Sequence, residues 1–479
     1  MVEVRNMAKF RIFIILFLLL CIISADSLFA PPFWDDIIGV HNQAVWLGQH
    51  DFNIAVLAKM SKESGSACYN LVNPLCYLYG ICYKFLPPDI THFCSHLVNI
   101  ASIAGCGTLL LLMLAKSSLP DRMLYLAGAL SCPLIIAACC STGQESPLAF
   151  MIMLSFYFHF RRRKRAAWIT GIIACCFKLT AVVLIFAYGA ESLLRALRNR
   201  KIFSVRNFFI LFAFAICVAA YLFHFSHISN HFKVKTDEWL SLFCNAYYLL
   251  LPIFLISVII LKKFSSRYIY FLPVGLFLLF YYIANAVSGM VSLPRYGIII
   301  VFPTIFLFAS SVKYLSSFKR KAAVLAVIAL GLCNIYGYFL PEPGALLLHD
   351  GSFMERSREF TVMRSSDREF CAAIEKEFHS SVLICAWPML HMLTVPEFGY
   401  VKKSLKNVYA GEYSHCLGNV RKMSKETLQL DPIFIFTPDC YNWRIPAGAE
   451  IVWCSNRRNP LSGYLLYRLP SLSRSSSMR

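Results

Sequence analysis

Two adjacent carboxylates, Asp35 and Asp36, follow the first apolar segment of the chain, and Trp34 precedes them directly. A carboxylate drawn to the centre of a membrane helix costs roughly 2.5–3.5 kcal/mol, but at a membrane surface the cost is much smaller. The position suits a general base that acts on a substrate whose reactive end lies among lipid headgroups. The alternative interpretation is a solvated loop that only ends a helix.

Four further residues are candidates for binding the substrate. Lys178 stands in an otherwise apolar stretch, and Glu145 lies in a short polar turn. Arg295 and Tyr296 follow a proline at the start of a late apolar segment. A lysine supplies a point charge to a phosphate, whereas an arginine grips it through two parallel hydrogen bonds.

Two histidine groups permit a divalent metal site. His224, His227 and His231 have the i, i+3, i+7 spacing that places side chains on one helix face. His92 and His96 flank Cys94 in a second group. Ordinary interfacial histidines are the alternative interpretation for both, so no cofactor is assigned.

The cysteines give no metal-binding pattern of their own. The sequence contains no Cys-x-x-Cys motif, which leaves a structural zinc site of that type unsupported. Most of the 19 cysteines lie inside apolar segments, where they act as small apolar residues. Four are predicted to lie outside the membrane and permit a disulfide of undefined pairing: Cys68, Cys76, Cys82 and Cys94.

Composition indicates a polytopic α-helical membrane protein. Of its 479 residues, 58% are hydrophobic and only 15% are charged, whereas a soluble domain carries about 25% charged residues. The formal net charge of +20 comes from short basic runs between apolar segments. Because membrane topology requires such runs, the charge does not indicate nucleic acid as a partner.

The basic runs set the predicted orientation. Basic residues precede the first apolar run, 10–30, which places the N-terminus in the cytoplasm and the loop 31–92 outside. This run is about 20 residues long, enough to span a bilayer, so we interpret it as an uncleaved span and not a signal peptide. The runs Arg161–Arg165 and Lys319–Lys321 mark further cytoplasmic loops.

The stretch Ala166–Leu194 is apolar but has basic residues at both ends. A single span cannot place both ends in the cytoplasm, so we predict two short helices that turn around Phe177 and Lys178. The alternative is one long span from which Lys178 reaches the interface. With this hairpin and the first span, about 11 transmembrane helices are predicted, the others at 93–115, 122–140, 147–160, 206–225, 239–261, 268–288, 294–312 and 322–340.

The composition changes after Pro341, which separates a predicted transmembrane domain, 1–340, from a second domain. The number of crossings places this second domain, 341–470, outside the cytoplasm. A helix at 367–378 and strands at 381–385, 433–437 and 463–468 predict a small α/β fold. The serine- and arginine-rich tail, 471–479, is predicted to be disordered.

In chain order these features resemble the GT-C superfamily of membrane glycosyltransferases, and most closely bacterial enzymes of the protein O-mannosyltransferase and aminoarabinose-transferase type. The first span followed by an acidic pair matches the family pattern. Asn73-Pro74-Leu75-Cys76-Tyr77 is similar to the family's His-Pro-Pro-Leu-Tyr-Tyr stretch, without its histidine and first proline. The hairpin and Pro294-Arg295-Tyr296 also have counterparts, but Ser146 stands where the family commonly has an aspartate.

The resemblance implies a donor in which a sugar is linked to a polyprenyl phosphate, and an acceptor that is a glycolipid, a polysaccharide or a protein. Asp35 would be the base and Asp36 an orienting residue. Arg295 and Lys178 would stabilise the leaving phosphate, and Trp34, Glu145 and Tyr296 would complete the substrate site.

Two other classes of protein remain as alternatives. A transporter or flippase would need paired repeats or several intramembrane charges along a path. A membrane scaffold with an outer binding domain would have no use for Asp35 and Asp36 beside Arg295. Because the unusual charges are predicted to converge on one side of the membrane, the sequence favours the enzyme.

Overall fold

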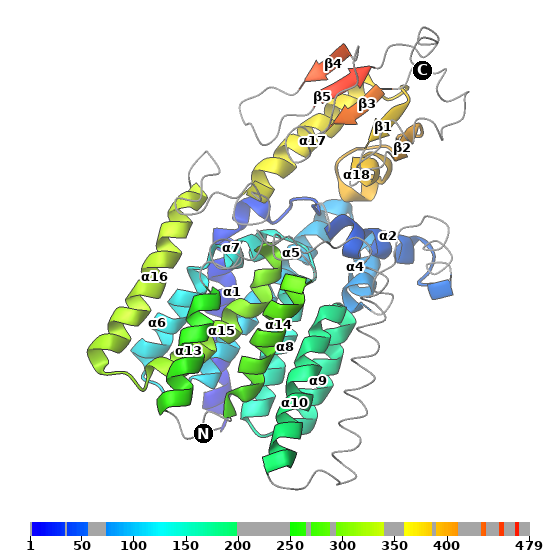
Figure 1. Ribbon diagram of the computed structural model, residues 1–479. Coiled ribbons are helices and arrows are strands. Elements are labelled where there is room, and N and C mark those ends of the chain that lie inside the picture. Colours follow the sequence, from blue (N-terminus) through cyan, green and yellow to red (C-terminus); the bar gives the residue numbers. More distant parts are fainter. Residues whose placement is uncertain are drawn as a thin grey trace, which may run out of the picture. The chain divides into compact units, whose positions relative to one another are not determined.

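The computed structural model describes residues 2–33, 36–55, 73–198, 250–264, 270–287, 294–339, 359–385, 389–410, 433–436, 450–454 and 465–468, mostly as helices (Figure 1). The predicted span 206–225, the first half of 239–261 and the tail 471–479 lie outside this set. The chain divides into two compact units. Unit 1 comprises 1–28, 69–75 and 95–359, and unit 2 comprises 29–68, 76–94 and 360–479.

Unit 1 is a helical bundle with α15 (Ile298–Val312) at its centre. Every residue of α15 is buried, and its sequence is apolar all round, as expected for a helix covered on all sides. It packs against α6 (Leu119–Leu130), α8 (Glu145–Phe160), α13 (Leu250–Phe264) and α14 (Leu272–Val287). The other described helices of this unit are α1 (Val2–Ile23), most of α5 (Pro88–Met113), α7 (Pro133–Cys140), α9 (Lys164–Phe177), α10 (Val182–Arg198) and α16 (Ser317–Phe339).

The predicted span at 122–140 is not one straight helix. It is divided into α6 and α7, which are bent by 67°. Pro133 lies in the first turn of α7, where its missing N–H is tolerated, whereas within a continuous helix its ring would clash with the preceding turn. Among the described residues α5 alone is long and apolar enough to cross a membrane by itself, and α6 with α7 qualifies as a broken span.

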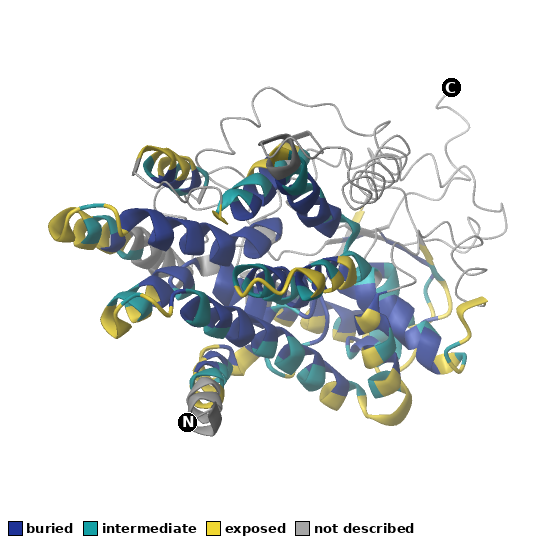
Figure 2. Cartoon of the chain, turned by 90° about the horizontal axis from the view of Figure 1, so that it is seen from below, coloured by how far each residue is buried: buried dark blue, intermediate teal, exposed yellow. Residues whose placement is uncertain are grey.

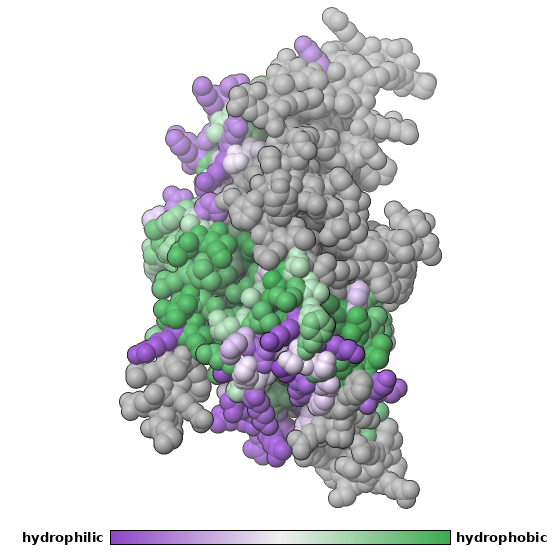
Figure 3. All heavy atoms as spheres, turned by 90° about the vertical axis from the view of Figure 1, so that its left-hand side faces the viewer, coloured by the Kyte–Doolittle hydropathy of each residue, from purple (hydrophilic) through white to green (hydrophobic). Residues whose placement is uncertain are grey.

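Large apolar side chains cover the outside of unit 1. Ile22, Ile259 and Phe318 are 73%, 64% and 81% exposed. The face in Figure 3 shows a broad band of apolar residues with hydrophilic residues gathered at its edge, while buried residues follow the inner sides of the helices (Figure 2). Soluble monomers seldom expose apolar surface of this extent, and lipid-facing helices do, so unit 1 has the surface of a membrane-embedded protein.

The predicted hairpin at 166–194 is confirmed. α9 ends at Phe177, a 3₁₀ turn follows (η3, Leu179–Ala181), and α10 runs back beside α9 (Figure 1). A Cβ placed on Gly171 would lie 3.2 Å from Ile185 Cδ1, whereas the two residues would be about 21 Å apart along one continuous helix. The hairpin packs on α8 through Ser155, whose hydroxyl donates to Ala167 O at 2.7 Å and lies 2.8 Å from the Tyr188 hydroxyl.

Unit 2 combines the first loop with the C-terminal part of the chain. Its first-loop elements are a π-helical segment (η2, Ile37–His41), α2 (Asn42–Gln49) and most of α4 (Pro74–Phe85). Its C-terminal helices are α17 (Glu359–Glu377) and α18 (Met389–Thr394). The strands are β1 (Leu383–Cys385), β2 (Val408–Ala410), β3 (Ile433–Phe436), β4 (Glu450–Cys454) and β5 (Leu465–Arg468).

The five strands form one sheet in the order β2-β1-β3-β5-β4. β1 is parallel to β2 and β3, with Leu383 opposite Val408 and Ile433, and β5 is antiparallel to β3 and β4. The helix predicted at 367–378 is confirmed as α17, which begins eight residues earlier, at Glu359. The three predicted strands are confirmed as β1, β3 and β5, with ends shifted by at most two residues. β2, β4 and α18 were not predicted.

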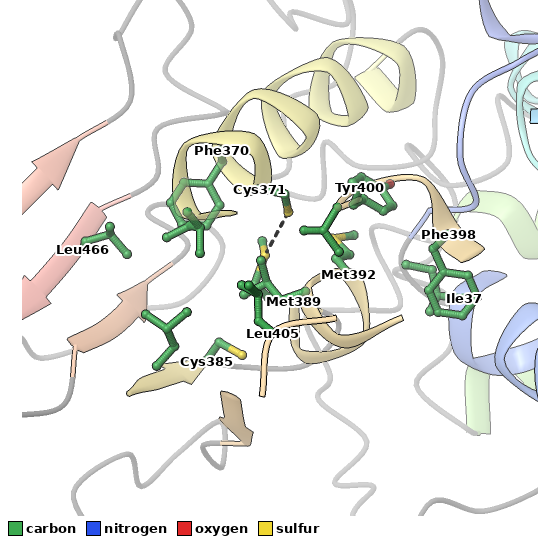
Figure 4. Packing of buried hydrophobic residues seen from close by; sticks show 14 of the residues in the cluster. Ile37, Phe370, Cys371, Cys385, Met389, Met392, Phe398, Tyr400, Leu405 and Leu466 are labelled. Carbon is green, nitrogen blue, oxygen red and sulfur yellow. Dashed lines mark hydrogen bonds between the residues drawn. The ribbon is translucent and has the colours of Figure 1, made fainter. Parts of the chain in front are cut away.

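The core of unit 2 contains residues from both of its parts. Ile37, directly after the acidic motif, is fully buried with Phe398, Met392 and Phe370 of the C-terminal part. Figure 4 shows Ile37 beside Phe398, with Cys371 and Met389 in sulfur contact at 3.7 Å farther along the same core. The first loop therefore contributes to the hydrophobic core of the α/β fold.

Candidate functional site

Lys178 lies at the break of the hairpin because its backbone is extended (φ −157°, ψ 132°), and α9 therefore ends just before it. Its ammonium Nζ lies 2.7 Å from Glu145 Oε1, in the first turn of α8. The two side chains are only 15% and 9% exposed. The positive end of the α8 dipole adds to the attraction for the Glu145 carboxylate.

Tyr296 covers the Lys178 ammonium. The centre of its ring lies 4.0 Å from Nζ, within the range of a cation–π contact. The backbone at Tyr296 is fixed because the buried Tyr281 hydroxyl donates to Tyr296 O at 2.9 Å. Arg295 shares the same 3₁₀ turn (η7, Pro294–Gly297), and its side chain lies outside the described part of the structure.

Asn73 joins three of the stretches singled out in the sequence. Its side-chain amide donates to Gln144 Oε1 at 2.7 Å and to Phe177 O at 3.2 Å, and Asn73 Oδ1 accepts from Leu75 N at 3.0 Å. The side chain is fully buried. Sequence reasoning identified this segment only through its family resemblance and missed the part played by Asn73 and Gln144.

The turn before α8 is held by hydrogen bonds between side chains and the main chain. Asn99 donates to Ser141 O at 2.6 Å, and Gly143 N donates to Ser141 Oγ at 3.1 Å. Ser146, at the position where the GT-C resemblance leads one to expect an aspartate, donates to Ala138 O at 3.4 Å. The carboxylate at this turn is therefore that of Glu145, one residue earlier.

Of the acidic motif, residues 34–36, the structure describes only Asp36. Asp36 is 8% exposed, its backbone N–H donates to Phe33 O at 2.9 Å, and the π-helical segment η2 follows it. Trp34 and Asp35 lie outside the described residues. Because Asp36 belongs to unit 2 and Lys178 to unit 1, the convergence of Asp35, Lys178 and Arg295 stays a prediction.

The second predicted histidine group has another partner. His92 Nε2 donates to Glu397 O at 3.2 Å. Within the described ranges no group of three His, Cys, Asp or Glu side chains is placed to hold a metal ion. His224, His227 and His231 lie outside those ranges.

The cluster of Lys178, Glu145 and Tyr296 can bind an anion. A buried ammonium keeps its charge only when it is paired, and here a carboxylate and an aromatic face supply that pairing. A phosphate oxygen is an equivalent acceptor for a lysine ammonium and could replace or join the carboxylate. The site therefore offers one fixed positive charge, the Lys178 ammonium, at the turn between α9 and α10.

No protein-family model matches the sequence, and no curated protein matches it. Two crystal structures of ArnT from Cupriavidus metallidurans are similar in fold. The apo structure has a TM-score of 0.50 at 12% identity, covering 97% of this chain and 98% of that chain. The structure bound to undecaprenyl phosphate has a TM-score of 0.47 at 12% identity, covering 95% and 97%. The likeness to apo ArnT over nearly the whole chain shows that this protein has the fold of ArnT, and it supports the resemblance to the GT-C superfamily.

Proposed function

We propose that the protein is an integral-membrane glycosyltransferase that moves a sugar from a polyprenyl-phosphate donor to an acceptor on the outer face of the membrane. The paired Lys178 ammonium at the break of a helix hairpin, within the ArnT fold, carries this proposal. ArnT has been solved bound to undecaprenyl phosphate, which supports a lipid carrier of the same class here. The acceptor is a glycolipid, a polysaccharide or a protein.

The proposed reaction is a displacement at the anomeric carbon. Asp35 takes the proton of the acceptor hydroxyl, the acceptor oxygen bonds to the anomeric carbon, and the bond from that carbon to the phosphate oxygen breaks. The lipid phosphate leaves with the electron pair. Asp36 orients the base or the acceptor, and Trp34 and Tyr296 provide aromatic surface for the substrate.

The leaving phosphate gains negative charge, so fixed positive charge favours the transition state. Lys178 provides a point charge and Arg295 a bidentate grip. Glu145 keeps the Lys178 ammonium in place before the donor arrives. In this proposal the donor phosphate takes over part of the pairing that Glu145 provides in its absence.

The same proposal includes the arrangement in the membrane. Residues 1–340 form the transmembrane domain of about 11 helices, with the N-terminus in the cytoplasm. Residues 341–470 form the extracytoplasmic α/β domain, followed by the tail 471–479. A reporter fused after the described strand β5, at Arg468, should report an extracytoplasmic position, and a cytoplasmic signal would contradict outer-face chemistry.

The direct test is sugar transfer by the purified protein in liposomes, with a panel of undecaprenyl-phosphate-linked hexoses and pentoses as donors and native membranes as acceptor. Asp35→Asn keeps the shape of the side chain and removes its basicity, so we expect transfer to fall by a factor of about 10²–10⁴. Asp36→Asn should cost less. Asp51→Asn is the control, because this carboxylate forms only an exposed ion pair with Lys84.

Transfer by Asp35→Asn at the wild-type rate would remove Asp35 as the base. Movement of the labelled donor between leaflets, without a new glycosidic bond, would identify a flippase instead. The two results are distinguished by following the sugar label and the lipid label separately.

A further inference from the structure

Residues 29–33, which lead into the acidic motif, contact the C-terminal part of unit 2. Pro31, Pro32 and Phe33 are all buried. A proline has no N–H, so its carbonyl is the only main-chain group that can fix its position through a hydrogen bond. The Tyr400 hydroxyl supplies that bond by donating to Pro32 O at 2.9 Å.

Tyr400 is held in place for this contact. It is 4% exposed, and burial raises the pKa of its hydroxyl, which therefore stays protonated and donates at neutral pH. Gly399, just before it, has a φ of +73°, a conformation that favours glycine. A Cβ there would also lie 3.2 Å from His92 Cε1, so the close approach of His92 requires glycine as well.

Two arginines of α17 contact the same segment. Arg364 is 2% exposed, and its guanidinium carbon lies 5.8 Å from the centre of the Phe33 ring. Arg368 Nη2 donates to Phe29 O at 3.4 Å. Positions four apart lie on one face of a helix, so α17 presents both guanidinium groups to residues 29–33.

The other side of the motif is fixed by packing. Ile37 is fully buried in the core of unit 2 and lies beside Phe398 (Figure 4). In the chain the acidic motif therefore lies between two sites, residues 29–33 and Ile37, that are both held by the C-terminal part. A base must be held in position relative to its substrate, because a displacement of about 1 Å can lower the rate of reaction about 10²-fold.

We propose that the C-terminal part of the chain is a positioning element for the acidic motif, with Tyr400 as the main positioning residue and Arg368 as a second one. This proposal rests on the proposed function. It adds that the C-terminal part of the chain affects the rate of the chemical step. A domain that only recruits the acceptor would change the affinity for the acceptor and leave the chemical step alone.

The test compares Tyr400→Phe with Tyr409→Phe in the full-length protein, with the donor panel described above. Tyr400→Phe removes the donor to Pro32 O and keeps the ring, whereas the Tyr409 side chain is 39% exposed. We expect kcat to fall 10- to 100-fold in Tyr400→Phe with an unchanged KM for donor and acceptor, and no effect in Tyr409→Phe. A raised KM for the acceptor at an unchanged kcat would overturn the proposal in favour of acceptor recruitment.

Hydrogen exchange gives a reading that does not depend on activity. The Asp36 N–H bonds to Phe33 O, so its exchange should become at least tenfold faster in Tyr400→Phe, and unchanged exchange would overturn the positioning role. If wild-type protein transfers no sugar while exchange still responds, the proposed function fails and the positioning role stands. If Tyr400→Phe does not fold, Arg368→Met replaces it as the test, because Arg368 is exposed and the substitution should not disturb folding. We expect a two- to fivefold loss of kcat in Arg368→Met.

Discussion

The side-chain amide of Asn73 donates to the carbonyl oxygen of Phe177, across 104 positions of the sequence. Phe177 is the last residue of α9, so this bond satisfies one of the carbonyls that the end of a helix leaves without a helical partner. The same amide also donates to Gln144 Oε1. The Asn73 side chain therefore fixes Phe177, which precedes Lys178, and Gln144, which precedes Glu145. The ion pair is thus aligned by a third residue, Asn73, through bonds to the residues that precede its two members.

Asn73→Asp tests this alignment. The substitution keeps the shape but places a carboxylate oxygen against two acceptors, Gln144 Oε1 and Phe177 O. We expect a loss of about 1–3 kcal/mol in the free energy of unfolding and a clear loss of sugar transfer. Asn53→Asp is the control, because the Asn53 side chain accepts a bond from Ala55 N in an exposed loop, which a carboxylate oxygen can also accept. Equal thermal stability of the two variants would contradict the assigned role.

A double-mutant cycle on Lys178 and Glu145 separates stability from activity. Each of Lys178→Met and Glu145→Gln leaves a buried charge without its partner, so each should cost about 3–5 kcal/mol of stability. The double variant should be more stable than the sum of the two losses predicts. It should still fail to transfer sugar, because it lacks the ammonium. Melting curves in detergent and the transfer assay give both readings, and an active double variant would exclude Lys178 from phosphate binding.

The contact between α9 and α10 predicts a size limit at Gly171. A Cβ there is tight only against the flexible end of Ile185, at 3.2 Å, while Leu184 Cδ2 at 3.5 Å and Ser155 Oγ at 3.7 Å are at ordinary contact distance. Gly171→Ala should therefore be tolerated. Gly171→Leu should push the helices apart, lower stability and reduce transfer. Gly275→Ala is the control, because a Cβ at Gly275 has no neighbour within 4 Å and alanine favours a helix by about 1 kcal/mol. Wild-type melting of Gly171→Leu would contradict the hairpin packing.

The thiols of Cys82 and Cys94 lie close enough to interact across the turn between α4 and α5. Both side chains are partly exposed. Mild oxidation with diamide should join them in a disulfide, which mass spectrometry of unreduced peptides would detect. Cys371 and Cys385 are buried and should stay reduced under the same conditions. A Cys82–Cys94 link that does not form would contradict this approach of the two helices.

Charge and proline patterns made part of the fold predictable. The break at Lys178 could be predicted because basic residues at both ends of a short apolar stretch exclude a single crossing. Pro133 also indicates the bend between α6 and α7. The bend was not predicted because the apolar run at 122–140 is long enough for one continuous span. β2 contains only three residues, too few to show the alternation that identifies a strand.

The contacts that build the candidate site were less predictable. The partners of Asn73 and the contact of Tyr400 with Pro32 join residues far apart in the sequence, and periodicity reports only on neighbours along the chain. Lys178, Glu145 and Tyr296 were each selected for their charge or family resemblance, and only the structure shows that they meet. The position of Asp35 relative to them stays a prediction.

The assembly of unit 2 from distant segments has a consequence for biosynthesis. Pro32 and Tyr400 are separated by 368 positions. At a synthesis rate of about 5–20 residues per second, Tyr400 leaves the ribosome roughly 20–70 s after Pro32. The nascent chain therefore exposes the segment before the acidic motif for most of its synthesis, and a chain that stops before residue 400 never provides the hydroxyl that binds Pro32.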